Sequence, residues 1–310
     1  MKAKEIAVKT WELLKKSFEL FSDKKGIKLS ASLSYYTIFS IAPLIIIIIY
    51  MCGIFFGPEA VRGEIFGQIK GLVGSESALQ IQEIVKNVKF SKDNVFAIVF
   101  GVITLVLGAS GVFGEIQDSI NSIWNLKAKP KKGLARIVKN RLISFSMIVS
   151  MAFILMVMLI VNALMDVFNN YLKARFPDVT VIFFYCVNLV LVFIVITLLF
   201  SIIFKVLPDG KVAWKDTLTG SIFTGILFMI GKFAIGAYLG NSHIGSSYGS
   251  AGSLIIILLW VYYSAMIMYF GATFTKVYAY TYGKKIIPNK YAVFTDDTEV
   301  ETGKTAPEVI

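Results

Sequence analysis

The chain has 310 residues, of which 56% are apolar and 16% charged, and its mean hydropathy is +0.71. Soluble domains average about 45–50% apolar and about 25% charged residues, so this composition indicates a membrane protein. Cys52 and Cys186 lie in separate apolar runs, which excludes a disulfide-stapled secreted fold. The net charge is +11, and its meaning depends on where the basic residues lie relative to the bilayer.

Residues 1–29 are predicted to form a cytoplasmic amphipathic helix. Apolar side chains recur at helical spacing, while lysines and glutamates cover the opposite arc; the apolar set is Ala7, Trp11, Leu14, Phe18 and Phe21. A basic amphipathic helix directly before a membrane span is typical of a helix lying in the headgroup layer. Anchoring of the first span is the simpler interpretation, and lipid sensing is the alternative.

Six apolar segments are long enough to cross a bilayer as helices, which takes roughly 20 residues. They are residues 30–56, 95–112, 142–165, 180–204, 217–240 and 250–275. Lipid cannot satisfy free backbone amides, so apolar runs of this length are predicted to be helical. The predicted fold class is therefore all-α: a polytopic membrane protein with six transmembrane helices, over residues 30–282, plus amphipathic interfacial helices.

The first span carries polar side chains in its cytoplasmic half, including Tyr35, Tyr36 and Ser40, and is then interrupted by Pro43. Polar groups are unfavourable against lipid tails, and proline removes one helical hydrogen bond. These residues are candidates for a polar substrate pathway between helices. The alternative is a kink repaired by neighbouring helices, with no function.

A further helix is predicted after the second span, at residues 113–125. One face carries Phe113, Ile116, Ile120, Ile123 and Trp124, and acidic residues share the other face. The residues of this helix that are candidates for a functional role are Glu115, Asp118 and Trp124. The helix is interpreted as a cytoplasmic gate or, alternatively, as an interfacial helix that rests on the membrane.

Lys232 is the only charged residue within the six predicted spans. A lysine near the bilayer centre costs about 2.5–3.5 kcal/mol on insertion scales and persists where it faces protein, water or ligand. Contact with an anionic headgroup is one hypothesis, and snorkelling towards the outer headgroups is the other. The glycines of the fifth span favour close helix packing.

The distribution of basic residues predicts the orientation. The terminal segments and alternate loops, residues 1–29, 113–141, 205–216 and 276–310, carry 23 of the 31 Lys and Arg residues. By the positive-inside tendency, both termini are predicted to be cytoplasmic. Residues 283–310 lack helical periodicity and are predicted to form a disordered cytoplasmic tail.

Catalytic chemistry finds little support in this sequence. The single histidine, His243, lies in a short loop, and zinc-ligand spacing, a Ser-His-Asp set and a phosphate-binding Lys-Ser/Thr loop are all absent. The protein is therefore predicted not to be an enzyme and to use no metal or cofactor. Because the basic residues are spread over four segments, membrane lipids, anionic phospholipid among them, are the predicted partners rather than nucleic acid.

Three stretches in order resemble the YihY/BrkB family of membrane proteins, formerly labelled ribonuclease BN-like. The first is Ala31-Ser-Leu-Ser-Tyr-Tyr-Thr-Ile-Phe-Ser-Ile-Ala-Pro43, and the second is residues 114–125, ending in Ile-Trp-Asn. The third joins Leu207-Pro208, Tyr248-Gly-Ser-Ala-Gly252, Leu258-Leu-Trp-Val-Tyr262 and Gly271-Ala-Thr-Phe274. The family commonly has an acidic residue where this chain has Thr273, so the resemblance does not extend to any proton-linked role for that acid.

The resemblance implies a multi-pass protein of the bacterial inner membrane, linked in some members to virulence or envelope integrity. Together with Lys232 and the polar first span, it favours a transporter-like protein that handles a lipid or another amphipathic substrate. The alternative is a non-transporting envelope scaffold that binds partner proteins or anionic lipids. The sequence does not support the old ribonuclease label, because one histidine and scattered acids cannot supply a metal-dependent nuclease site.

Overall fold

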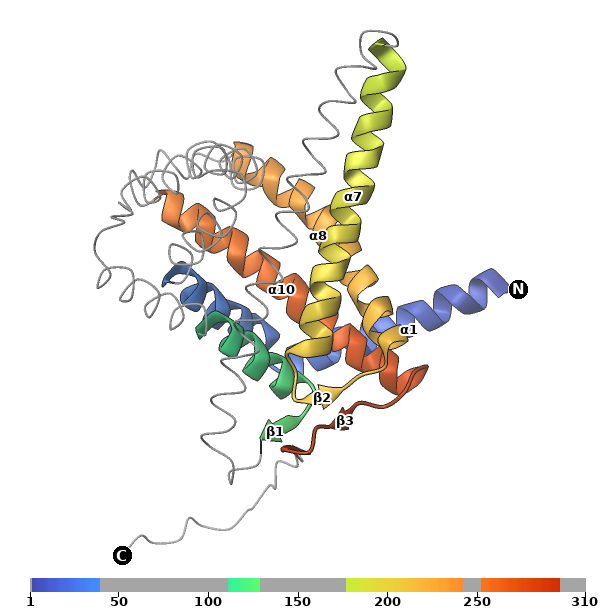
Figure 1. The fold of residues 1–310 in the computed structure, drawn as a ribbon, viewed down its shortest axis with the longest axis vertical. Coiled ribbons are helices and arrows are strands. Elements are labelled where there is room, and N and C mark those ends of the chain that lie inside the picture. Colours follow the sequence, from blue (N-terminus) through green and yellow to red (C-terminus); the bar gives the residue numbers. More distant parts are fainter. Residues whose placement is uncertain (1, 40–110, 129–176, 242–251, 296–310) are drawn as a thin grey trace, which may run out of the picture.

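The computed structural model describes residues 2–39, 111–128, 177–241 and 252–295, and these are mostly helical (Figure 1). The helices are α1 (Lys2–Asp23), a helix over residues 26–39, a helix over residues 111–123, α7 (Pro177–Val206), α8 (Trp214–Asn241) and α10 (Gly252–Thr281). The short strands are β1 (Leu126–Ala128), β2 (Gly210–Lys211), β3 (Ile287–Pro288) and β4 (Ala292–Phe294).

Three of the described helices are long and apolar enough to cross a membrane, over Leu189–Val206, Trp214–Ile235 and Ile257–Thr281. They coincide with the fourth, fifth and sixth predicted spans. The first predicted span is helical as far as residue 39. The remainder of that span, the third span and nearly all of the second lie outside the described residues, so the expectation of six transmembrane helices stays a prediction.

Helix α8 packs against both α7 and α10. Helices α7 and α8 lie next to each other where the chain passes from one to the other, and they diverge towards their far ends (Figure 1). Gly220 and Gly271 allow the close approach of α8 and α10, because a β-carbon on either would overlap a threonine of the facing helix, Thr275 or Thr224. The prediction of close packing is thus confirmed for Gly220 of the fifth span.

Apolar stripes on α7 and α8 face away from this packing. On α7, Val190, Ile194 and Leu198 are exposed, and on α8 the exposed positions follow a four-residue period: Trp214, Leu218, Ile222, Ile226 and Ile230. Such a stripe on a long apolar helix is typical of a surface in contact with lipid tails, which solvate leucine and isoleucine as well as a protein core does. The exposed stripes therefore agree with a membrane location.

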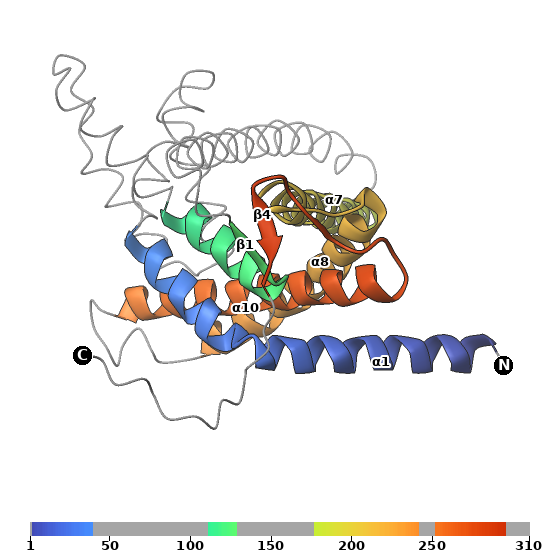
Figure 2. The same ribbon diagram turned by 90° about the horizontal axis from the view of Figure 1, so that it is seen from below.

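Helix α1 packs beside α10 and extends beyond it to one side (Figure 2). Leu13, Ser17 and Phe21 are buried, whereas Trp11 and Phe18 remain 70% and 66% exposed. The Phe21 and Phe270 rings meet edge to face, with centroids 5.7 Å apart. The predicted amphipathic helix is thus present, and its apolar arc is divided between a packing face and an exposed face.

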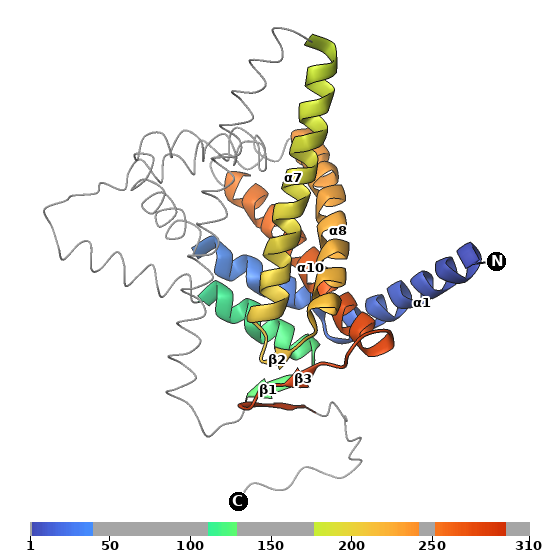
Figure 3. The same cartoon turned by 45° about the vertical axis from the view of Figure 1, so that its right-hand side comes forward.

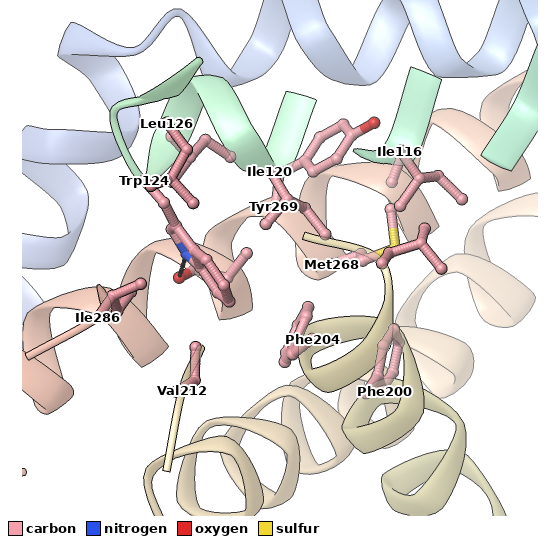
Figure 4. Close-up of a cluster of buried hydrophobic side chains, with 14 of the residues drawn as sticks. Ile116, Ile120, Trp124, Leu126, Phe200, Phe204, Val212, Met268, Tyr269 and Ile286 are labelled. Atoms are coloured by element: carbon pink, nitrogen blue, oxygen red, sulfur yellow. Dashed lines mark hydrogen bonds between the residues drawn. The ribbon is translucent and has the colours of Figure 1, made fainter. Parts of the chain in front are cut away.

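Helix 111–123 lies in the core of the described bundle. Its predicted apolar face is buried, with Ile120, Ile123 and Trp124 fully inaccessible to solvent. These side chains pack with Phe204 of α7 and Tyr269 of α10 in one hydrophobic cluster (Figure 4). The helix is therefore a central packing element and does not merely rest on a surface.

Four short strands depart from the all-α expectation. β1 pairs antiparallel with β4, Leu126 opposite Phe294, and β2 pairs antiparallel with β3, Gly210 opposite Pro288. Strands β3 and β4 lie within residues 283–310, which the sequence predicts to be disordered, so that prediction is wrong for these two strands. Two- and three-residue strands have no detectable periodicity, and their pairing partners lie far away in the sequence.

Candidate functional site

Lys232 lies on α8 and its side chain is half-buried. It makes no hydrogen bond or ion pair with any of the residues that the structure describes. By the helical repeat, Lys232 follows Gly225 by two turns and shares its face of α8. Gly225 faces α7, since a β-carbon there would lie 2.8 Å from Thr197 Oγ1 and 3.2 Å from Phe193 Cε2. The ammonium group therefore lies on the α7-facing side of an apolar helix.

Two hydroxyl groups of α7 lie near this interface without hydrogen-bond partners. Thr197 Oγ1 and Ser201 Oγ are buried and unpaired within the described part of the chain, and the two residues are one helical turn apart. Buried polar atoms are usually paired, and leaving one unpaired costs about 1–3 kcal/mol. Together with Lys232 they place three polar groups along the α7–α8 interface.

Two other predicted pathway residues, Tyr35 and Tyr36, lie on helix 26–39. Tyr35 and Tyr36 are 63% and 43% exposed, and their rings meet edge to face at 6.1 Å. Tyr36 lies against the start of helix 111–123, because a β-carbon on Gly111 would be 3.6 Å from its Cδ1 atom. Ser40 and Pro43 lie outside the described residues.

Three hydroxyl groups at the start of the first span are satisfied within their own helix. Ser30 Oγ donates to the Gly26 carbonyl at 2.8 Å, Ser34 Oγ to the Ser30 carbonyl at 2.9 Å, and Thr37 Oγ1 to the Leu33 carbonyl at 2.7 Å. Hydroxyl groups bonded to the carbonyl four residues earlier need no other partner. These hydroxyls alone therefore do not require a water-lined cavity. This weakens the argument that the polar half of the first span lines a substrate pathway.

The gate candidates occupy different environments along helix 111–123 and the turn that follows it. Asp118 is exposed and Glu115 is half-buried, while Trp124 is fully buried. The Trp124 indole Nε1–H donates to the carbonyl of Ala272 on α10 at 2.9 Å (Figure 4). Trp124 therefore attaches this helix to α10, and a gating role for the three residues stays a prediction.

A buried carboxylate, Asp209, joins helix 111–123 to the loop between α7 and α8. Its side chain is 1% exposed. Gln117 Nε2 donates to one carboxylate oxygen and Asn121 Nδ2 to the other, each at 3.1 Å, while the Asp209 amide donates to Asn121 Oδ1 at 2.8 Å. Hydrogen bonds to a charged acceptor are stronger than neutral ones. This cluster binds two segments that lie about 90 residues apart.

Sequence reasoning missed the Asp209 cluster. Asp209 lies in a short Pro-Asp-Gly segment between two apolar helices, where an acidic residue is typical of a solvated turn. The one available signal was the pair Gln117 and Asn121, polar residues spaced by one helical turn and next to the apolar stripe. Their burial depends on the loop that covers them, which the sequence does not reveal.

Lys276 of α10 caps the C-terminal end of helix 111–123. Its Nζ donates to the Ile123 carbonyl at 2.7 Å and to Asn125 Oδ1 at 3.1 Å. Asn125 has a φ of 58°, the left-handed conformation in which helices commonly end. A cation is favourable at this negative end of the helix dipole.

At the turn after α1, partial burial lowers the pKa of Lys24, and the nearby Asp23 carboxylate opposes this effect.

The candidate residues thus divide into two regions, of which the sequence predicted Trp124 and Lys232 but not Lys276 or Asp209. Trp124, Lys276 and Asp209 lie at the end of the bundle where α7 ends and α8 begins, whereas Lys232 lies 18 residues along α8 from Trp214, about 27 Å at the helical rise.

Among the described residues no group of three or more histidine, cysteine or acidic side chains could hold a metal ion. Thr273, where the resembling family commonly has an acid, is buried and donates to the Tyr269 carbonyl at 2.8 Å.

Comparison with known proteins gives a consistent family assignment. The family described as Virulence factor BrkB matches residues 17–292. A UPF0761 membrane protein of Saccharophagus degradans is 26% identical over 84% of this chain, and the match spans 58% of that relative. The UPF0761 membrane protein MS0032 of Mannheimia succiniciproducens is 25% identical over 83% of this chain and 86% of its own length.

A relative with a different description is the ribonuclease-like protein YfkH of Bacillus subtilis, 22% identical over 89% of this chain and 98% of its own length. No solved structure gives a significant match. The family match covers most of the chain, the relatives are membrane proteins, and the described helices include three that could span a bilayer. The chain belongs to the BrkB family of membrane proteins.

Proposed function

We propose that this protein handles a lipid or another amphipathic substrate in the bacterial inner membrane, without catalysing a reaction. The observation that carries the proposal is Lys232, a half-buried ammonium on an apolar helix with no partner among the described side chains. A cation at this depth is retained where it meets an opposite charge or water. An anionic headgroup supplies that charge.

The polar groups along the α7–α8 interface support an elongated amphipathic ligand over a small ion, because Gly225, which faces Thr197, lies seven residues from Lys232, about 10 Å at the helical rise. Thr197 and Ser201 offer buried hydroxyls on α7 that no described residue pairs with, and these suit the glycerol and ester oxygens of a lipid. Ile226 and Ile230 are 47% and 61% exposed on the neighbouring face of α8, where acyl chains would lie. A polar interface next to an apolar surface matches the two ends of a phospholipid.

Native mass spectrometry of the purified full-length protein tests the proposal, with Lys232→Met compared with wild type. The matched control is Lys16→Met, which removes an exposed lysine of α1. The lipids are measured at high salt, which screens exposed charges. Under these conditions the wild type and the control should retain an anionic lipid, whereas Lys232→Met should lose it. Lys232→Arg should preserve retention because it keeps the charge.

Lipid movement is then measured in liposomes with a labelled anionic phospholipid. Movement by wild type and Lys16→Met with at least a tenfold slower rate for Lys232→Met would support transport. Identical lipid content and identical movement in all variants would remove Lys232 from the mechanism. Absence of movement together with specific co-purifying proteins would favour the alternative, an envelope scaffold.

A further inference from the structure

The two small sheets bring three loops together at one end of the bundle. Here α7 ends, α8 begins and α10 ends, next to β1, β2 and β3 (Figure 3). The loops are also joined outside the ladders: the Asn289 amide donates to the Asp209 carbonyl at 2.9 Å, and the Lys284 amide donates to Asp216 Oδ2 at 2.9 Å. A single surface therefore forms from segments that are distant in the sequence.

The exposed charges of this surface are all positive. In residues 124–128, 205–216 and 281–295 the acidic residues are Asp209 and Asp216, which are 1% and 4% exposed and accept hydrogen bonds within the protein. The exposed charged side chains of the same residues are lysines, which we call the lysine platform: Lys127, Lys211, Lys215, Lys284, Lys285 and Lys290. Folding thus hides the negative charges of these loops and leaves the positive ones exposed.

Exposed aromatic residues indicate where this surface lies relative to a membrane. Trp214 begins α8 and is 65% exposed, and near the end of α10 Tyr280 and Tyr282 are 41% and 50% exposed. Tryptophan and tyrosine are enriched at the boundary between lipid and water. Because Lys215 and Lys284 lie within two residues of these aromatics in the sequence, their ammonium groups are within reach of lipid headgroups.

The strand pairs add apolar groups beside the lysines. Lys127 is opposite Val293, and Lys211 is opposite Ile287. Directly opposed residues of antiparallel strands share a face, and Val293 and Ile287 are 40% and 62% exposed. A lysine next to an exposed aliphatic side chain suits a bilayer interface, where the cation meets phosphate and the aliphatic group enters the acyl boundary.

We propose that the lysine platform binds the headgroups of anionic phospholipids in the leaflet next to it. By the positive-inside tendency this is the cytoplasmic leaflet. The inference does not depend on the proposed function, because Lys232 lies 17 residues along α8 from Lys215, about 26 Å at the helical rise. The platform fixes the bundle at the membrane surface and enriches anionic lipid beside it.

The test measures binding of phosphatidylglycerol and phosphatidylcholine to the full-length protein in mild detergent by native mass spectrometry. The platform variant carries Lys211→Gln, Lys215→Gln, Lys284→Gln and Lys285→Gln. The matched control loses the same charge from residues 57–94, which join the first two predicted spans on the opposite side of the membrane, through Lys70→Gln, Lys86→Gln, Lys89→Gln and Lys92→Gln. Thermal unfolding confirms that each variant is folded.

Wild type should prefer phosphatidylglycerol, and the preference should weaken with salt because exposed charges are screened. The platform variant should bind phosphatidylglycerol at least about tenfold more weakly, since each lysine near an anionic surface contributes favourably. A variant with arginine at the same four positions should bind phosphatidylglycerol as tightly as wild type does. Unchanged binding by the platform variant, or an equal loss in the control, would overturn the proposal.

The same titration separates the two proposals. Lys232→Met should bind added phosphatidylglycerol as wild type does at low salt, because its platform is intact. The platform variant should keep the lipid that wild type retains at high salt. Loss of the salt-sensitive binding in Lys232→Met would show that the platform is not an independent site.

Discussion

At the scale of single residues, the buried Asp209 carboxylate accepts a side-chain hydrogen bond at each of its two oxygens. We predict that Asp209→Leu destabilises the protein strongly, because it leaves the amide groups of Gln117 and Asn121 buried without acceptors. Each unpaired group costs about 1–3 kcal/mol. Asp209→Asn should cause a smaller loss, since it keeps one acceptor oxygen.

The measurement is thermal unfolding of the purified protein in detergent, with Asp23→Asn as the control. Asp23 is exposed at the end of α1, and its replacement should change stability by less than about 0.5 kcal/mol. An unfolding temperature for Asp209→Leu equal to that of wild type would show that the Asp209 cluster does not hold the two segments together.

At the scale of elements, the contact between α8 and α10 depends on the absence of side chains at two positions. We predict that Gly220→Ala separates these helices and lowers the unfolding temperature, because the new methyl group would overlap the side chain of Thr275 and approach its Cα to 3.2 Å. Overpacking of this kind typically costs about 1–3 kcal/mol.

Gly114→Ala is the matched control for this prediction. Among the described residues a β-carbon on Gly114 meets no atom within 4 Å, and alanine is favoured over glycine in a helix by roughly 0.5–1 kcal/mol. The control should therefore be neutral or stabilising in the same thermal assay. If both glycine variants behaved alike, the helix contact would not be the reason for the effect.

At the scale of the whole molecule, α1 and the lysine platform are predicted to lie on the cytoplasmic side. We expect a cysteine introduced by Lys9→Cys or Lys285→Cys, in a chain without Cys52 and Cys186, to react with a membrane-impermeant maleimide only after the cells are permeabilised. Both positions are exposed, so access to the side chain does not limit the reaction. Labelling of either cysteine in intact cells would reverse the predicted orientation.

The sequence by itself determined the membrane class, the helical character and three of the predicted spans, because lipid imposes length and apolarity on each helix separately. It also determined the buried face of helix 111–123, since Ile120, Ile123 and Trp124 follow the helical repeat. These features are local, so a single stretch of residues is enough to predict them.

Only the tertiary structure decided which polar residues meet. Asp209 is buried because Gln117 and Asn121, about 90 residues away, supply its hydrogen bonds, and the exposed lysines gather because short strands pair across the chain. No local pattern encodes such contacts, since each depends on the packing of distant segments. The same packing places Trp124, which the sequence gives only as a gate candidate, against the Ala272 carbonyl of α10.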